Sequence, residues 1–365
     1  MELVVAFFES DNQVLRSCDD SYGNVGEVFR YDATELFTHY AQDIEDKSYL
    51  SDLVFKLYEE DEYGVREELV DHASQFLPEE TLRSLAQRFW ENAENIDKTV
   101  KDNQYDARHS LLAVESLARQ LHDAPLFERA ALAVWPGLSS RTCLDIAEVY
   151  LEAQEPEKAL DWIKKVPPEM TLEDYKRDKL LLDIYRKIDN QEKLAEVAWR
   201  IFRRHKDVDN LEELLSIIGE DQREKVIAET SQEIMANPSS FYYDISFLLD
   251  TNQVDLAQKY VLENEDTLNG DQYGLMLTLA QRFEKENRFL VLTIIYRKLL
   301  ESILGRAQSK YYKYGVRYLK NLEKLAPQVS DWQGVLPHEL YFKKIAETHA
   351  RKKSFWDKYQ GSTRE

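Results

Sequence analysis

Two matching segments constrain the fold more than any other feature of the chain. Tyr150 and Tyr185 lie 35 residues apart, and each closes an apolar helical run that is followed seven residues later by Glu-Lys-Ala-Leu (157–160) or Glu-Lys-Leu-Ala (192–195). Periods near 34 residues are typical of helix-turn-helix repeats, which stack into a solenoid with a concave binding surface. The two matching segments therefore predict a helical-repeat protein.

Further landmarks extend this pattern along the chain. With Tyr150 at the central aromatic position, the small residues Ala147 and Ala159 fall where two tetratricopeptide helices cross closely. From Tyr150 onward, the corresponding apolar positions follow at spacings of 35, 32 and 30 residues. A fifth helical pair is expected over 272–285 and 288–304. Five degenerate pairs without a Gly- or Pro-rich linker predict one continuous array, with tetratricopeptide-like repeats over residues 138–305.

The rarity and placement of helix breakers support an all-α fold. Only 11 Gly and 9 Pro occur in 365 residues, and the prolines fall between apolar periodic segments. Proline removes a backbone hydrogen bond and clashes inside a helix, so this placement is typical of helix–loop–helix architecture. We expect a right-handed α-α superhelix, with an N-terminal helical region over 1–137 and a basic C-terminal cap over 306–365.

Local patterns predict individual elements in the N-terminal region. We expect a leading helix over 1–17, a helix from Glu27, another through 50–57, and a solvated turn at the acidic run 59–62. Pro78 is expected as the first residue of a helix, followed by helices over 105–122 and 126–135 that end at the breaker 135–137. Later, Thr171-x-x-Asp174 resembles a capping box.

Charge and cysteine content narrow the functional class. The net charge of −21 argues against the whole chain being a nucleic-acid binder. Residues 297–365 nevertheless carry 15 Lys/Arg and 7 Asp/Glu, a net of +8, which leaves −29 for residues 1–296. Cys18 and Cys143 form no CxxC pair, and the apolar stretch 3–8 is too short for a signal or membrane segment. We expect a soluble cytoplasmic protein without membrane association.

A stripe of cations in the C-terminal region is a candidate binding site. Its members recur at steps of four and three residues, which would place them on one helical face: Arg306, Lys310, Lys313, Arg317, Lys320 and Lys324. Tyr311, Tyr314 and Tyr318 form an adjoining stripe. Interleaved cations and aromatic rings can track a phosphate backbone and stack bases. The simpler alternative is that the rings pack on the preceding helix while the cations pair within the protein or with a protein partner. We favour this alternative because the acidic remainder of the chain repels phosphates.

A second basic cluster, Arg351, Lys352 and Lys353, precedes Phe355 and Trp356. We expect a terminal helix here, whose two aromatic residues dock on the last helical pair and cap the solenoid. Together with the stripe, this cluster forms the candidate surface for a nucleic acid, which is the alternative function.

The loop that contains Asp19, Asp20, Ser21, Gly23, Asn24 and Gly26 combines carboxylates with glycines. An EF-hand counted from Asp19 would need Glu at its twelfth position, where Arg30 stands, and the glycines do not match a phosphate-binding loop. A capped turn that leads into a helix is the favoured interpretation. A metal-dependent enzyme using Asp19, Asp20 and Asn24 is the third hypothesis.

Catalytic patterns are scarce. The seven histidines are scattered with no HExxH pair, and the sequence contains neither a nucleophile elbow nor a dinucleotide fingerprint. We therefore expect a non-enzymatic protein with no cofactor and no metal.

Several stretches resemble a known family. They are Cys18–Val28, the run from Glu148 to Leu160 in the repeats, Tyr273-Gly274, Tyr296–Leu304, Arg306–Tyr312, and the closing His349-x-Arg351-Lys352-x-Ser354-Phe355-Trp356. These segments are similar to a bacterial family of uncharacterised helical proteins, known only as a domain of unknown function. That family resembles the region accompanying the zinc finger in SWIM-type proteins. The resemblance implies a tetratricopeptide-like fold and a bacterial source but no activity, and the zinc signature is missing from this chain.

These observations favour an interaction scaffold that binds a protein or peptide in the groove formed by the first helices of the repeats. Nucleic-acid association through the basic C-terminal residues is the alternative.

Overall fold

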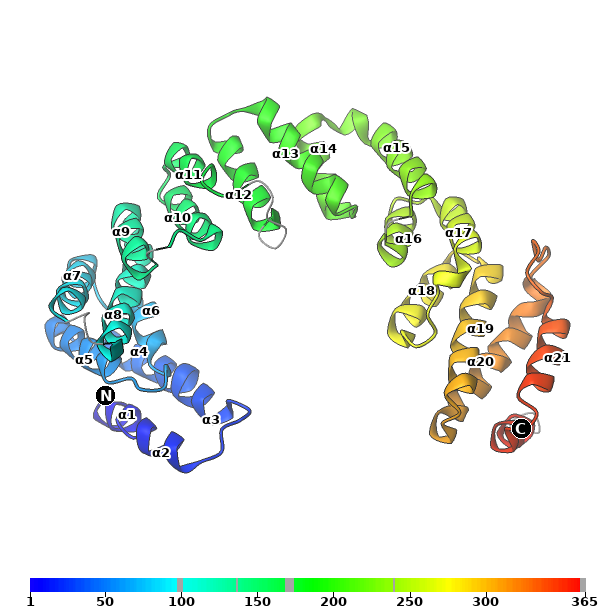
Figure 1. Cartoon of the computed structure of the whole chain (residues 1–365), viewed down its shortest axis with the longest axis horizontal. Helices are drawn as coiled ribbons and strands as arrows, with labels where there is room; N and C mark the ends of the chain where they lie inside the picture. Colours follow the sequence, from blue (N-terminus) through cyan, green and yellow to red (C-terminus); the bar gives the residue numbers. More distant parts are fainter. Residues whose placement is uncertain (97–100, 136, 168–173, 239, 362–365) are drawn as a thin grey trace. The chain divides into compact units, whose positions relative to one another are not determined.

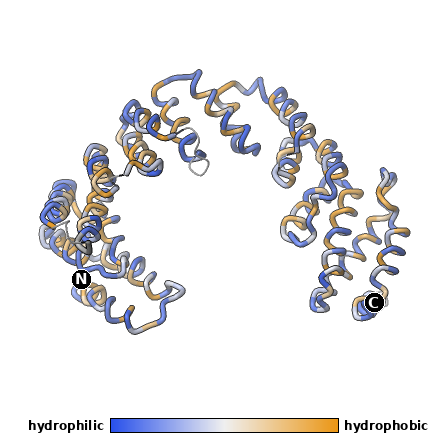
Figure 2. The backbone as a smooth tube through the Cα atoms, in the orientation of Figure 1, coloured by the Kyte–Doolittle hydropathy of each residue, from blue (hydrophilic) through white to orange (hydrophobic). Residues whose placement is uncertain are grey.

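The computed structural model describes residues 1–96, 101–135, 137–167, 174–238 and 240–361, with the side chains of 101–103 left aside. Within these ranges the chain forms helices and turns and no strand, so the predicted all-α class is confirmed (Figure 1). Apolar and polar residues alternate along the helices, as expected of amphipathic elements (Figure 2). In the described part of the chain no helix combines the length and the apolar character needed to cross a bilayer.

The helices divide into two compact units, 1–197 and 198–365, with the division inside one helix, α13. The first unit contains α1 (Glu2–Phe8), α2 (Asp11–Ser17), α3 (Asn24–Glu27), the π-helix Val28–Ala33, α4 (Thr34–Gln42), α5 (Lys47–Glu59), α6 (Glu67–Asp71), α7 (Glu79–Asn95), α8 (Lys101–Gln120), α9 (Ala124–Val134), α10 (Ser140–Glu152), α11 (Pro156–Ile163), α12 (Asp174–Lys187) and the first part of α13 (Gln191–Arg204).

The second unit begins with the rest of α13. It continues through α14 (Val208–Ile218), α15 (Arg223–Ala236), α16 (Phe241–Asp250), α17 (Val254–Glu263), α18 (Tyr273–Lys285), α19 (Phe289–Arg306), α20 (Tyr312–Leu325), α21 (His338–Thr348) and α22 (Lys353–Gly361). The predicted fifth pair agrees with α18 and α19 to within two residues at each end. The predicted boundaries near residues 137 and 305, the single continuous array and the tetratricopeptide character stay predictions.

One turn recurs between paired helices and gives the repeat a structural basis. Its αL residue is not glycine, and its members are His122 (φ 52°), Gln154 (φ 62°), Asp189 (φ 54°), Asn252 (φ 60°) and Asn287 (φ 55°). Each time this residue donates its N–H to the carbonyl three residues earlier, and the next residue donates to the carbonyl five residues earlier, at 2.7–3.3 Å. This is the Schellman geometry, which satisfies the last carbonyls of one helix just before the next helix begins.

The landmark tyrosines occupy different environments although both precede this turn. Tyr150 is buried and its hydroxyl donates to Glu128 Oε2 at 2.6 Å, whereas Tyr185 is half-buried. Ala147 and Ala159 are fully buried, as expected for small residues where helices cross. The two matching segments therefore occupy equivalent backbone positions in two helical hairpins.

The N-terminal segment differs from the single helix predicted over 1–17. The chain breaks at Glu9 and Ser10 into α1 and α2, and Asp11, the first residue of α2, contacts the loop after α5. There Asp11 forms a fully buried, bidentate ion pair with Arg66: Nη2 lies 2.6 Å from Oδ1 and Nε 2.7 Å from Oδ2. The remaining guanidinium donors reach the carbonyl oxygens of Leu57 at 3.0 Å and Phe8 at 2.9 Å.

The acidic run 59–62 is only in part the solvated turn expected from the sequence: Glu60 and Glu62 are exposed, but Asp61 is not. Asp61 is buried and accepts backbone N–H bonds from Tyr63 and Val65 at 3.2 Å and from Arg66 at 2.7 Å. Three amide donors compensate the burial of a carboxylate. The run therefore organises the loop that presents Arg66 to Asp11.

Two helix starts in the first unit differ slightly from those predicted from the sequence. The helix expected from Glu27 begins at Asn24 and passes through the π-helix, and Pro78 is the N-cap of α7 instead of its first residue. Pro136 of the predicted breaker and Thr171 of the predicted capping box lie outside the described residues.

The core of the second unit is built around α19, which is buried over most of its circumference. A helix that is apolar on all sides must be covered on all sides, and α18 and α20 pack on it (Figure 1). Two glycines allow the close approach. A Cβ at Gly270 would lie 2.1 Å from the Lys298 carbonyl oxygen, and one at Gly315 would lie 3.1 Å from the Phe355 ring and 3.2 Å from Ile303.

The C-terminal elements close over this core. Phe355 is fully buried against Tyr312, with ring centroids 5.6 Å apart, and the Trp356 indole N–H donates to the His349 carbonyl at 3.0 Å. Arg297 of α19 is buried with its guanidinium 4.2 Å from the centre of the Tyr341 ring. The two aromatic residues thus dock as expected of a terminal helix.

Candidate functional site

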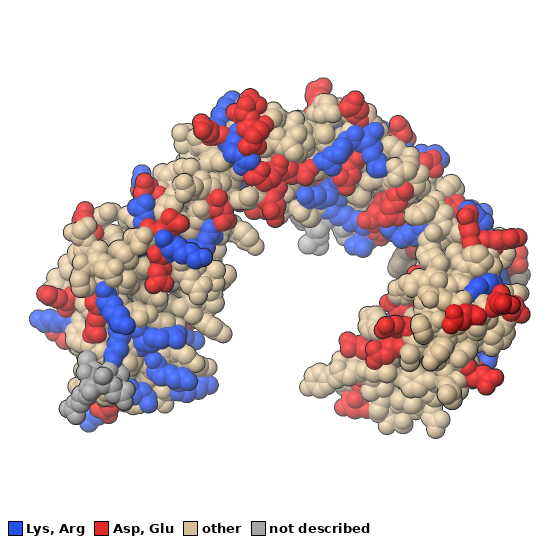
Figure 3. All heavy atoms as spheres, turned by 180° about the vertical axis from the view of Figure 1, so that it is seen from behind, with Lys and Arg blue, Asp and Glu red and all other residues tan. Residues whose placement is uncertain are grey.

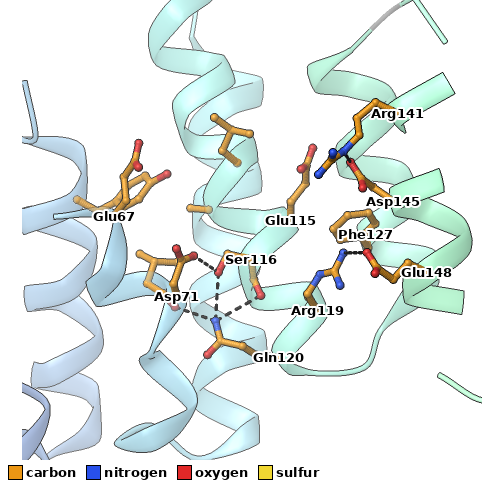
Figure 4. Close-up of a pocket in the computed structure, with 14 residues that line it drawn as sticks. Glu67, Asp71, Glu115, Ser116, Arg119, Gln120, Phe127, Arg141, Asp145 and Glu148 are labelled. Atoms are coloured by element: carbon orange, nitrogen blue, oxygen red, sulfur yellow. Dashed lines mark hydrogen bonds and ion pairs between the residues drawn. The ribbon is translucent and has the colours of Figure 1, made fainter. Parts of the chain in front are cut away.

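A groove of about 610 Å³ lies in the first unit, formed by α6, α8, α9 and α10 (Figure 4). Its walls come from the first helices of two successive hairpins, α8–α9 and α10–α11. On α10 the residues Arg141, Asp145 and Glu148 line it at spacings of four and three, which places them on one helical face. Glu115, Ser116 and Arg119 line it from α8. The sequence predicts a binding surface on the first helices of repeats within residues 138–305; of the helices that line this groove, only α10 lies in that range.

The position of α6 in the groove is fixed by hydrogen bonds from α8. Gln120 donates to the Val70 carbonyl at 2.8 Å and accepts the Ser74 amide at 2.8 Å. The Ser116 hydroxyl donates to Asp71 (Figure 4). The bonds to α6 use the Val70 carbonyl and the Asp71 carboxylate, and Glu67, at the start of α6, lines the same groove.

Cations neutralise one side of the groove. Asp145 pairs with Arg141 at 3.0 Å and with Lys176 of α12 at 2.7 Å. Glu148 pairs with Lys176 at 3.0 Å and with Arg119 at 3.5 Å. This network links three first helices, α8, α10 and α12, through their side chains.

Glu115, on α8, differs from the paired carboxylates of Asp145 and Glu148. Among the described residues its Oε1 atom has no hydrogen-bond partner, although that atom is buried. Burial, helped by the charge of Asp145, raises the pKa of Glu115 to about 7. Burial and the charge of Asp61 also raise the pKa of Glu67. The groove therefore holds two carboxyl groups whose ionised forms are disfavoured by burial and by a neighbouring carboxylate, an arrangement that favours a bound cation.

The residues of this groove form no motif that stands out in the sequence. The available signal was the polar face of α10, where Arg141, Asp145, Glu148 and Glu152 recur at helical spacing on a helix that begins a repeat. Acidic residues are so frequent in this chain that such a face is not distinctive without the groove.

The loop over 19–26 adopts the capped turn favoured by the sequence. Asp19 Oδ1 accepts the Ser21 amide at 3.1 Å, and the two oxygens of Asp20 accept the amides of Val25 and Gly26 at 2.8 Å each. Gly23 supplies the αL residue (φ 77°), and α3 starts at Asn24. Within the part of the chain that the structure describes, no three His, Cys, Asp or Glu side chains converge on a metal-sized site, at this loop or elsewhere.

The cationic stripe does not lie along one helix, which corrects the sequence interpretation. Arg306 is the last residue of α19, Ala307 adopts αL (φ 56°), and Lys310 lies in a 3-10 turn before α20 begins at Tyr312. Lys313, Arg317, Lys320 and Lys324 remain on α20. The chain breaks here because α20 turns back to pack on α19.

Lys and Arg side chains gather on the C-terminal helices of the second unit (Figure 3). Arg306 lies 3.5 Å from Asp271, and the rings of Tyr311 and Tyr314 carry cations at 4.9–5.7 Å from their centres. Tyr318 is buried and stacks on Tyr296 of the preceding helix. The cationic stripe and the adjoining tyrosines thus combine one packed ring, that of Tyr318, with exposed rings and cations.

The second basic cluster lies where α21 gives way to α22. Arg351 and Lys352 occupy the turn, and Lys353 begins α22. Arg351 and Lys353 are exposed and Lys352 is half-buried. The cluster is separated in sequence from the stripe but belongs to the same compact unit.

Comparison with known proteins assigns the chain to a family but does not assign it an activity. No curated protein matches it. A solved structure described as a "Circular tandem repeat protein with novel repeat topology and enhanced subunit contact surfaces" is 13% identical, with 96% of this chain and 73% of that chain covered, at a TM-score of 0.13. A score this low carries no structural argument, so the fold assignment rests on the helices described above.

The link to the region beside SWIM-type zinc fingers stays an expectation from the sequence. The family match is direct: the model of a family of unknown function, DUF6880, covers residues 1–134 and 136–358. The chain belongs to the DUF6880 family.

Proposed function

We propose that the protein is a non-catalytic interaction scaffold, whose groove between α8 and α10 binds a peptide segment with basic side chains. One observation carries the proposal: Glu115 lines the groove with a buried carboxyl oxygen that lacks a hydrogen-bond partner among the described residues. A buried polar atom without a partner is costly, and a ligand that supplies the partner recovers that cost.

The charge arrangement supports a cationic ligand. The carboxylates of Asp145 and Glu148 already bind cations of the protein, whereas Glu67 and Glu115 have raised pKa values. A lysine or arginine side chain beside either carboxyl group would stabilise its ionised form. The aromatic ring of Phe127 and the side chains of Val70 and Leu112 offer apolar contact beside them. A basic side chain with an aliphatic stem matches this lining.

The position of the groove supports a peptide instead of a small metabolite. It is open, and its lining comes from helices of successive hairpins, as in repeat proteins that bind extended segments across their first helices. The network from Lys176 to Asp145 and Glu148 continues this polar surface onto α12.

A random-peptide library selected on the full-length protein tests the proposal. We expect enriched peptides to contain Lys or Arg, and a synthetic copy to lose about tenfold or more in affinity for Glu115→Gln, measured by fluorescence anisotropy. The matched control is Asp161→Asn, which removes the same charge from the exposed face of α11. Equal binding to wild type and Glu115→Gln, or enrichment of peptides without cations, would contradict the proposal.

A further inference from the structure

A second pocket, of about 300 Å³, lies within the second unit between α18, α19 and α20. We call it the Tyr–Arg pocket, and its chemically distinctive lining is Tyr273, Tyr311, Tyr314, Tyr318, Arg306 and Arg317. Its size is at the lower end of the range for ligand sites, roughly 300–1,000 Å³. Four phenol rings and two guanidinium groups in such a volume are unlike the acidic groove of the first unit.

Packing holds part of the aromatic wall in place. Tyr318 is 4% exposed and stacks on Tyr296, with ring centroids 5.8 Å apart and planes inclined by 29°. Tyr311 and Tyr314, by contrast, are 37% and 38% exposed, so their rings are accessible to a ligand. The apolar side chains of Leu299 and Ile303 complete the floor.

The two arginines are positioned by the same rings. The guanidinium carbon of Arg317 lies 5.5 Å from the centre of the Tyr314 ring and 5.6 Å from that of Tyr318. That of Arg306 lies 5.7 Å from the centre of the Tyr311 ring. A guanidinium held near aromatic rings keeps its N–H groups for an anion, which it can bind in bidentate fashion. Asp271 opposes this role, because its carboxylate lies 3.5 Å from Arg306.

We propose that the Tyr–Arg pocket binds a nucleobase together with its phosphate. The base stacks on the exposed tyrosine rings, and the phosphate is bound by Arg317 and by Arg306, where it competes with Asp271. This inference is independent of the peptide-binding groove. A carboxylate side chain of a protein partner would use the arginines and leave the rings unused, whereas a nucleotide uses both. Lys310 and Lys313, next to the rings, add positive charge where further phosphates would follow.

The same chemistry is presented by a free nucleotide and by an unpaired segment of nucleic acid, so the test has two arms. The full-length protein is titrated with UMP and AMP by calorimetry, and with fluorescein-labelled dT12 and rU12 by anisotropy, at low and physiological salt. Binding of mononucleotides identifies a nucleotide site, and binding of oligonucleotides alone identifies a single-strand site. Failure of both arms at low salt overturns the proposal.

Variants separate the pocket from general attraction to a basic surface. Tyr314→Ala removes an exposed ring, and we expect it to weaken binding about 5- to 100-fold, the range for loss of one stacked base contact. Arg317→Gln removes one charge from the phosphate site, and we expect it to weaken binding about 10- to 100-fold, the range for loss of one hydrogen bond to a charged group. Lys324→Gln removes the same charge from α20 away from the pocket and should change affinity less than threefold. An equal loss of affinity for Lys324→Gln and Arg317→Gln, or unchanged binding to Tyr314→Ala, would show that surface charge alone drives binding. Either result would overturn the proposed pocket.

Discussion

Removal of the Asp11 carboxylate should destabilise the first unit severely. The Arg66 guanidinium is 2% exposed and directs two of its N–H groups to Asp11 and two to carbonyl oxygens of Phe8 and Leu57. In Asp11→Ala the positive charge stays buried with only the two carbonyls as partners. Loss of one member of a buried ion pair costs about 3–5 kcal/mol, because the other charge is left uncompensated.

Hydrogen exchange followed by mass spectrometry measures this effect locally, which matters because the two units need not unfold together. We expect amides of α1, α2 and α5 in Asp11→Ala to exchange about two to four orders of magnitude faster, the rate equivalent of that free energy. Amides of α18 and α19 serve as the internal reference and should be unchanged.

A surface pair between the same two segments provides the control. Arg16 and Glu62 are 2.5 Å apart, but their side chains are 63% and 54% exposed. Solvent screens such a pair, so Glu62→Gln should leave exchange within measurement scatter. Replacing both members of the buried pair, as in Asp11→Leu with Arg66→Met, should recover most of the protection, since no charge is then buried alone. Equal exchange in Asp11→Ala and Glu62→Gln would refute the reasoning.

Three further predictions concern backbone strain, close packing and pH. Ala307→Gly should raise the free energy of unfolding of the second unit by about 0.5–1 kcal/mol in urea denaturation, because Ala307 is exposed and its αL conformation (φ 56°) suits glycine; a loss of stability would contradict this. Gly270→Ala should lower it by about 1–3 kcal/mol, because the new Cβ would lie 2.1 Å from a backbone oxygen; Gly274→Ala, with nothing within 4 Å, is the control and should not destabilise. Glu115 has a folded pKa of about 7 against an ordinary 4.5, so its contribution to stability is full below pH 4.5 and is lost as pH rises through 7. From pH 5 to pH 8, urea titrations should therefore show the free energy of unfolding of wild type falling relative to that of Glu115→Gln. A basic peptide should bind wild type more tightly at pH 8 than at pH 5. Differences in stability and affinity that do not change with pH would contradict both expectations.

The helices and their pairing were accessible from sequence because the signals are local. The fifth pair, expected over 272–285 and 288–304, is observed as Tyr273–Lys285 and Phe289–Arg306. Periodicity and proline placement act over one or two turns, so they mark a helix without knowledge of its neighbours. The recurring Schellman turn escaped notice because its αL position holds His, Gln, Asp or Asn instead of a repeated glycine.

The candidate sites were only partly accessible. Arg306 and Arg317 were selected for their spacing, and the structure brings them to one pocket; their helical continuity was wrong because Ala307 breaks the chain where α20 folds back on α19. Asp61 was assigned to solvent because an acidic run resembles a surface turn, yet three backbone amides bind it. Its burial depends on the loop that positions Arg66.

The sequence by itself determined an all-α chain of paired helices with a basic C-terminal end, since composition, periodicity and charge are properties of the chain. Tertiary structure alone decided that Glu115 of α8 would share a groove with Asp145 of α10, and that Asp11 would meet Arg66. The members of each pair lie 30 and 55 residues apart in the sequence. Their contacts, and the burial that raises the pKa of Glu115, depend on neighbours that a local pattern does not encode.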